Sequence, residues 1–243
     1  MPRIAKAYIA LVIASGALAV LISARSWSSA NLLQLVIYLG LAALASTLKV
    51  RIPGLEGTVS PNFVFILLGI VALPFSQVVA ISLTAAFVQS LWASAKRARL
   101  VQVAFSAAAL VLSCSLAFKL SHLFLTASGV DSSVACVILA GSIYFPVNSA
   151  LVSVVIGLVE GQPLKQVCQR CYEWTFSYFM GGIAFAGLIS SAYARSAAWK
   201  GALVLLPAMV LAYVYFLNRS AHPLPTRIHA SPAEEEYPVE IHS

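Results

Sequence analysis

The chain has 243 residues, of which 60% are hydrophobic and 9% are charged, with a net charge of +7 and a mean hydropathy of +0.91. Soluble domains are about a quarter charged, so a chain this apolar from end to end excludes a soluble domain with a single membrane anchor. The basic excess is spread over short loops, which is typical of membrane orientation and contact with anionic lipid and argues against nucleic acid as a partner.

Long apolar stretches recur along the chain and predict an all-α, polytopic transmembrane bundle of about eight segments. A spanning helix needs about 20 apolar residues, because the hydrocarbon core is about 30 Å thick and the rise is 1.5 Å per residue. The first stretch could also be interpreted as a signal peptide. We prefer a retained helix, because the stretch is longer than a usual signal core and another span follows at once. The predicted segments of this domain (1–217) lie near 7–23, 31–48, 63–73, 76–92, 100–125, 133–159, 175–194 and 201–217.

The stretch from Lys49 to Arg99 is the centre of this prediction. Its apolar run from Phe63 to Trp92 contains 30 residues, and Pro74 divides it because proline removes a backbone donor and clashes with the preceding turn. We therefore expect a tight membrane hairpin whose first arm is tilted, extended into the preceding loop or re-entrant. A re-entrant arm is stable in a membrane only where protein covers it or where it faces a water-filled cavity.

The distribution of basic residues favours this hairpin. With eight segments and a cytoplasmic amino terminus, 11 of the 15 Lys and Arg residues lie inside and 4 lie outside. If residues 63–92 formed one crossing, the split would be 7 against 8. The positive-inside rule therefore favours the broken hairpin, with both termini in the cytoplasm. The outside residues are Arg25, Lys119, Arg195 and Lys200.

Two segments outside the spans complete the layout. Residues 160–174 are polar and are predicted to form a loop between two spans. Residues 218–243 are rich in Pro, His and Glu and lack apolar periodicity, so we expect a disordered cytoplasmic tail.

Groups that catalyse reactions are sparse. The eight acidic residues lie in predicted loops, at span ends or in the tail, which argues against a carboxylate relay and against a protease with paired aspartates. We find no Ser/His/Asp constellation and no phosphate-binding glycine loop. The sequence therefore predicts a protein that is not an enzyme and that uses no cofactor.

Two smaller features leave alternatives open. Cys168 and Cys171 have the spacing of redox pairs and of half a zinc site, but neither setting is complete, so we interpret them as reduced thiols and predict no metal. Lys119 lies near the outer end of a span. It is either a counter-ion for an anionic ligand or, as we prefer, a lysine whose amine reaches the headgroups.

Polar residues within spans are the best pointer to a binding site. They either join helices by hydrogen bonds worth about 0.6 kcal/mol each or line a polar pocket for a small ligand. Pro146 favours the pocket, because a proline inside a span frees a backbone carbonyl. The candidate residues are Ser60, Asn62, Gln77, Gln89, Gln102, Tyr144 and Asn148.

Small residues follow one face of the first span. Ala10 and Ala14 form a small-xxx-small pair between Ala7 and Ala17. Such a face permits close approach of another helix, so we predict that Ala10 and Ala14 contact a partner.

The segment Lys49–Arg99 also carries a resemblance. It contains the patterns Arg51-Ile-Pro-Gly54, Gly57-Thr-Val-Ser60, Asn62-Phe-Val-Phe65 and Val88-Gln-Ser-Leu-Trp92. These resemble a bacterial multi-span module that precedes diguanylate cyclase or HD-type phosphodiesterase domains. The resemblance implies a membrane sensor with a cytoplasmic carboxyl terminus. Only 26 residues follow Leu217 in this sequence, so we expect it to act through a partner.

A weaker similarity is to the substrate-binding membrane subunits of energy-coupling-factor transporters. Those subunits bind vitamins and dock a partner through an Ala-x-x-x-Ala face, for which Ala10 and Ala14 are the equivalent here. We therefore expect a non-enzymatic membrane protein that binds a small ligand or senses the membrane and couples to a cytoplasmic or membrane partner. The alternative is a subunit of a transporter for a vitamin-like molecule.

Overall fold

The structure is a computed structural model that describes residues 2–51, 58–92, 99–193, 197, 199–205 and 207–210. The elements are α1 (Arg3–Arg25), α2 (Leu32–Thr47), β1 (Val50–Arg51), β2 (Thr58–Val59), α3 (Asn62–Ala72), α4 (Phe75–Leu91), α5 (Leu100–Ser128), α6 (Ser133–Glu160) and α7 (Leu164–Ala192). Residues 199–205 and 207–210 are also helical.

The predicted all-α class is confirmed. The strands β1 and β2 are two residues each and pair antiparallel, with Val50 opposite Val59 and Arg51 opposite Thr58. This small ladder closes the connection between α2 and α3. The other elements of the described ranges are helices.

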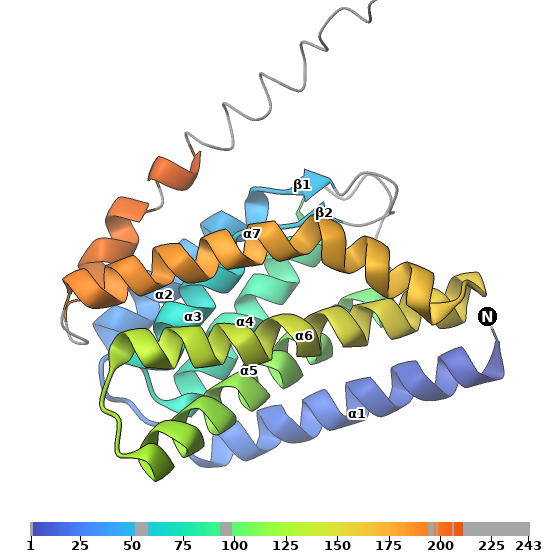
Figure 1. Ribbon diagram of the computed structural model, residues 1–243. Helices are drawn as coiled ribbons and strands as arrows, with labels where there is room; N and C mark the ends of the chain where they lie inside the picture. The colour runs from blue at the N-terminus through green and yellow to red at the C-terminus, as the bar shows by residue number, and fades with distance from the viewer. Residues whose placement is uncertain are drawn as a thin grey trace, which may run out of the picture.

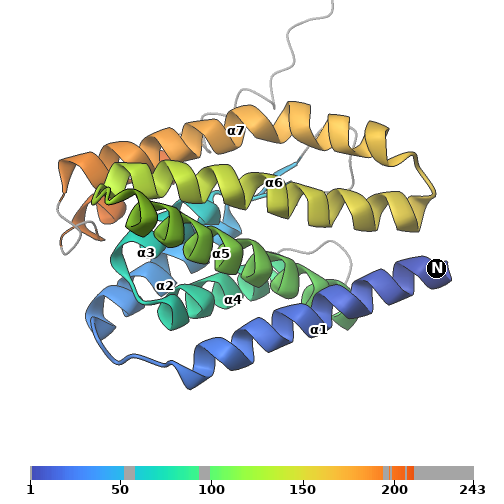
Figure 2. The same cartoon turned by 60° about the horizontal axis from the view of Figure 1, so that its bottom comes forward.

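The long helices run side by side along one direction (Figures 1 and 2). α7 and α1 lie on opposite sides of the bundle, with α5 and α6 between them. The shorter helices α3 and α4 pack against this set, and α2 packs on α3 and α4. The amino terminus of α1 lies at the same end as the start of α7 and the end of α6.

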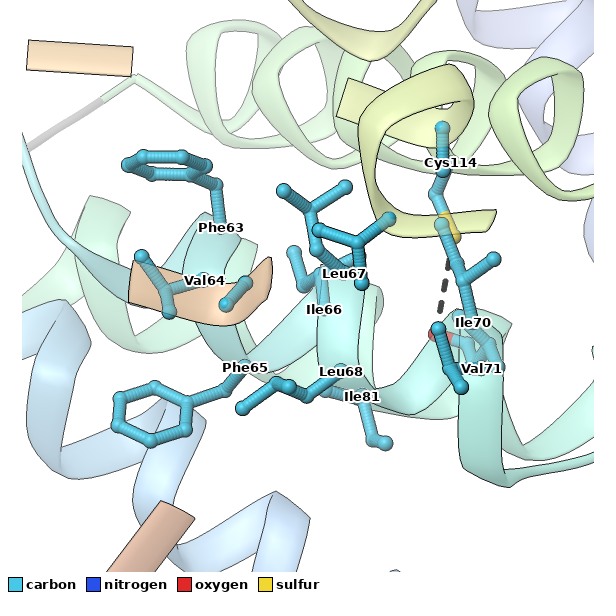
Figure 3. Packing of buried hydrophobic residues seen from close by; sticks show 14 of the residues in the cluster. Phe63, Val64, Phe65, Ile66, Leu67, Leu68, Ile70, Val71, Ile81 and Cys114 are labelled. Carbon is cyan, nitrogen blue, oxygen red and sulfur yellow. Dashed lines mark hydrogen bonds between the residues drawn. The ribbon is translucent and has the colours of Figure 1, made fainter. Parts of the chain in front are cut away.

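Helix α3 occupies the centre of the core. Ten of its 11 residues are buried, and α2, α4, α6 and α7 all pack against it. Its side chains leave the helix axis in all directions and meet other helices (Figure 3). A helix that is apolar all round is stable only when it is surrounded. At 1.5 Å per residue it is about 16 Å long, roughly half of a hydrocarbon core of about 30 Å.

Pro74 separates α3 from α4. α3 ends at Ala72, Leu73 and Pro74 are extended, and α4 begins at Phe75. Proline fits immediately before a helix, because the amide that it lacks would have no partner within the helix there. Each helix packs against the other, so the chain turns back at Pro74 as a hairpin.

Four helices of the described chain are long and apolar enough to cross a membrane, which indicates a membrane protein. They are Arg3–Arg25, Leu100–Ser128, Ser133–Glu160 and Thr175–Ala192. α2, α3 and α4 are apolar but shorter. The structure does not confirm the predicted count of about eight segments.

The prediction of a loop over residues 160–174 is wrong. α6 ends at Glu160, Gly161 adopts φ 67°, and α7 begins at Leu164 and continues without a break to Ala192. Leu, Lys, Gln, Arg and Glu, which dominate its first turns, all favour the helix although most are polar. Low hydropathy marks the end of an apolar span, but it does not mark the end of a helix. Residues 211–217 of the last predicted segment and the tail 218–243 lie outside the described residues.

Candidate functional site

A buried polar network lies at the start of α3. Asn62 is the first residue of α3 and is 3% exposed. Its Nδ2 donates to Ser46 Oγ on α2 at 3.0 Å and to Gln89 Oε1 on α4 at 3.1 Å. Ser46 is fully buried and donates in turn to the Ala42 carbonyl at 2.7 Å. One amide thus joins three helices inside an apolar core.

Two of these three residues were predicted from the sequence, and Ser46 was not. The only sequence signal for Ser46 was its position as a polar residue near the end of the predicted segment 31–48. Its contact with Asn62 depends on how α2 packs against α3, which no local pattern specifies.

Ser60 lies two residues before the first residue of α3. It is 3% exposed, and its hydroxyl has no hydrogen-bond partner in the part of the chain that the structure describes. Between it and α3 is Pro61, the N-cap residue, whose side chain has no atom that can accept a hydrogen bond. The first amides of a helix have no partner within the helix. At the start of α3 the Val64 amide donates to the Pro61 carbonyl at 3.2 Å, and the remaining donors are the amides of Asn62 and Phe63.

Aromatic rings surround the same end of α3. The Phe63 ring lies 4.4 Å from that of Phe179, 5.4 Å from Tyr178 and 6.5 Å from Tyr144, centroid to centroid. Gly182 leaves room for it, since a Cβ at that position would lie 2.1 Å from Phe63 Cζ. These partners come from the middle of α6 and α7, so α3 begins inside the bundle.

The other predicted pocket residues lie apart from this network. Tyr144 is buried beside Phe63, while Asn148 is half-buried one turn further along α6, and its Oδ1 has no partner among the described residues. Pro146 lies between them on an exposed position of α6. No described hydrogen bond joins Asn148 to Asn62, whose side chain bonds to Ser46 and Gln89.

Gln77 lies at the opposite, closed end of the hairpin. It is fully buried, and its Nε2 donates to the Ser28 carbonyl at 3.0 Å and to the Ala30 carbonyl. Gln77 therefore ties the connection between α1 and α2 to the start of α4. This is a structural contact at the far end from Asn62.

Gln102 is exposed in the first turn of α5. Its Oε1 accepts a hydrogen bond from the Arg99 amide at 3.1 Å, which is the half of a capping box that the N3 side chain supplies. A capping box satisfies amides that the helix leaves unpaired. The structure places Gln102 outside the buried network.

Ala10 and Ala14 both lie on the exposed side of α1. The opposite face carries Val12 and Gly16 and packs on α5, where a Cβ on Gly16 would lie 2.5 Å from Ala108 Cβ. The close helix crossing within the protein therefore uses Gly16, and the face of Ala10 and Ala14 remains uncovered.

Charged groups lie at the two ends of the bundle. Lys49 Nζ donates to the Trp92 carbonyl, which joins the end of α2 to the end of α4. Partial burial lowers the pKa of Lys49 below its ordinary value. Lys119 is exposed, with Nζ 5.4 Å from the centroid of the Phe75 ring, a cation–π contact at the other end.

Metal ligands do not gather in the described residues, where no three His, Cys, Asp or Glu side chains lie together. Cys168 is a half-buried free thiol on α7. The side chain of Cys171 is not among those described, so the pair is not characterised further.

Comparisons of the chain with protein-family models, with curated proteins and with solved structures found no match. The resemblances to sensor modules and to transporter subunits therefore stay predictions, carried by residues 49–99 and by Ala10 and Ala14.

Proposed function

We propose that this chain is a non-enzymatic protein of the bacterial inner membrane that binds a small ligand within its helical bundle and acts through a cytoplasmic protein partner. The observation that carries the proposal is the buried network of Asn62, Ser46 and Gln89 at the start of α3. The resemblance of residues 49–99 to sensor modules supports a partner that signals.

The energetic argument concerns the cost of polar groups in an apolar core. Hydrogen bonds between membrane helices stabilise them by only about 0.6 kcal/mol on average. A buried hydroxyl without a partner costs about 1–3 kcal/mol, and Ser60 is such a group next to the network. A ligand bound beside Ser60 would supply the missing partner for its hydroxyl.

The charge distribution supports a cytoplasmic amino terminus. The starts of α1 and α7 lie at one end of the bundle (Figures 1 and 2), and more basic side chains belong to elements that begin or end there than to those at the opposite end. Those with described side chains at that end are Arg3, Lys6, Lys49, Arg99 and Lys165, and those at the opposite end are Arg25, Lys119 and Lys200. This is the bias that the positive-inside rule associates with the cytoplasm.

Native mass spectrometry of the protein in a mild detergent tests the proposal. We expect the wild-type chain to retain a small molecule or a co-purifying protein, and Asn62→Leu to lose the small molecule. Gln102→Leu is the matched control, because Gln102 is exposed and outside the network. A wild-type protein that carries neither a ligand nor a partner would contradict the proposal.

A second candidate function is the membrane subunit of a small-molecule transporter. The observation in its favour is that Ala10 and Ala14 form an uncovered small-residue face on α1. If a transporter component docks there, Ala10→Leu together with Ala14→Leu should abolish its co-purification. Ala184→Leu, which changes an exposed alanine on α7, should leave it intact.

A further inference from the structure

We propose that the ligand of this site is a small oxyanion, a carboxylate or a phosphate group, bound at the amino-terminal end of α3 by the first backbone amides and by the Ser60 hydroxyl. This inference rests on the proposed function, because it names the chemistry of the ligand at the same site.

The helix supplies the first part of the site. α3 has 11 residues and begins at Asn62 with Pro61 as its N-cap. The aligned peptide dipoles place roughly half a positive charge at a helix amino terminus, where the free amides also point outward along the axis. Oxyanions bind at such ends, and short helices within membrane transporters direct them at anionic groups.

The Ser60 hydroxyl supplies the second part of the proposed site. The Ser60 side chain is 3% exposed, and within the described residues its hydroxyl has no hydrogen-bond partner. Serine often caps a helix by accepting a bond from a first-turn amide, but here Pro61 holds the N-cap position and Ser60 makes no such bond. The Ser60 hydroxyl is therefore a donor without a described partner, two and three residues before the amides of Asn62 and Phe63, and an oxyanion oxygen accepts from donors of these kinds.

The neighbouring groups fit an anion better than a cation. The side-chain amide of Asn62 is fixed by hydrogen bonds to Ser46 and Gln89, so the start of α3 is held in place before any ligand binds. Lys49 follows α2 by two residues and contributes positive charge on the same connection. Among the carboxylates with described side chains, Asp131 and Glu160 belong to the ends of α5 and α6, and neither comes from α2, α3 or α4.

Burial of the start of α3 strengthens the attraction between a bound anion and the helix dipole. Phe63 and Val64 are each 2% exposed, and rings from α6 and α7 cover this end of α3. Attraction between a charge and a dipole grows as the local dielectric falls. The same enclosure limits the site to a small anionic group.

The test measures thermal unfolding of the purified full chain in a neutral detergent, followed by intrinsic fluorescence. One arm adds inorganic phosphate or acetate, with chloride at the same ionic strength as reference. The other arm compares nanodiscs of phosphatidylcholine with nanodiscs that also contain phosphatidylglycerol. We expect a saturable rise in Tm with one of these oxyanions, since a ligand that binds only the folded state stabilises it.

Variants at Ser60 localise the binding. Ser60→Ala should weaken the apparent affinity about tenfold or more, because it removes a hydrogen bond to a charged group. Ser60→Thr keeps the hydroxyl and should bind like the wild type. The matched control is Ser76→Ala, which removes another 3%-exposed serine hydroxyl without a described partner, at the far end of the hairpin.

The outcomes separate the sources of the anion. Stabilisation by phosphate or acetate in detergent identifies a free small anion, and stabilisation only by phosphatidylglycerol identifies a lipid headgroup. No stabilisation in either arm, or an equal effect of Ser60→Ala and Ser76→Ala, would overturn the inference. If the protein then still retained a neutral molecule that Asn62→Leu releases, the proposed function would stand and only the oxyanion would be wrong.

Discussion

Helices α3 and α1 are both strongly apolar, but for different reasons. α3 is 11 residues long with ten of them buried, whereas α1 is 23 residues long with five of them buried. On α1, Leu11 is 65% exposed and Leu18 is 58% exposed. An apolar sequence therefore does not say what covers a helix. Neighbouring helices cover α3, and in a membrane lipid would cover the outer face of α1.

The difference in length has a consequence at the helix ends. At 1.5 Å per residue, α1 is about 34 Å long and reaches both surfaces of a bilayer core, with Arg3 and Arg25 at its ends. α3 is about half as long and starts among α2, α4, α6 and α7. Its first polar groups must be satisfied by protein or ligand, and this is where Asn62 and Ser60 lie.

The largest contrast is expected between truncations of large apolar side chains in the two helices, one buried and one exposed. Phe65→Ala removes a fully buried ring from α3 and should lower the free energy of unfolding by about 3–5 kcal/mol. Leu11→Ala changes an exposed side chain on α1 and should cost less than about 0.5 kcal/mol. Reversible unfolding in mixed micelles measures both, and equal losses would contradict the difference in burial.

Adjacent glycines on α7 provide a second contrast. Gly182→Ala places a methyl group against the Phe63 ring and should cost about 1–3 kcal/mol, because the ring is held between other aromatic side chains. Gly181→Ala meets nothing within 4 Å and should be neutral or stabilising by about 0.5–1 kcal/mol. The same unfolding assay reports both values. A neutral Gly182→Ala would mean that α3 does not pack closely on α7.

The polar residues at the two ends of the hairpin should differ in their energetic coupling to Asn62. A double-mutant cycle of Asn62→Ala and Gln89→Ala should give a coupling energy of about 0.6–1.7 kcal/mol, since the two amides share a hydrogen bond. The cycle of Asn62→Ala and Gln77→Ala should be additive, because Gln77 bonds only to carbonyls of the α1–α2 connection among the described contacts. Coupling between Asn62 and Gln77, without coupling between Asn62 and Gln89, would contradict the position of the network at the start of α3.

The smallest expected effect concerns Lys49. Its lowered pKa means that the unfolded chain binds the proton more readily than the folded protein in the range between that pKa and 10.5. The free energy of unfolding should therefore rise with pH across this range. Lys49→Arg keeps the charge without titrating there, so the slope should disappear in unfolding measured from pH 8 to 10.5.

Local features of the sequence predicted the backbone of the central hairpin well. Pro74 acts within one turn of the helices it separates, so α3 and α4 begin and end close to the predicted arms. The polar start of α7 was missed, because hydropathy reports affinity for lipid while residues such as Lys165 and Gln166 form helix equally well in water.

The candidate site was predicted only in part. Asn62 and Gln89 meet, but Gln77 and Gln102 have separate structural contacts, and Ser46 was not anticipated. All are polar residues in or beside apolar segments, and composition does not distinguish them. What separates them is the packing of α2 and α4 around α3, which arises from contacts between residues distant in the sequence.

The central claim is that the chain turns back at Pro74, so that the segment before α3 and the segment after α4 lie at the same side of the membrane. A chain without its four natural cysteines that carries Lys49→Cys and Trp92→Cys tests it in native vesicles. Because Lys49 Nζ contacts the Trp92 carbonyl, we predict that a short reagent cross-links this pair and that an impermeant maleimide labels both positions from the same side. Labelling from opposite sides, with no cross-link, would contradict the hairpin and the site that it positions.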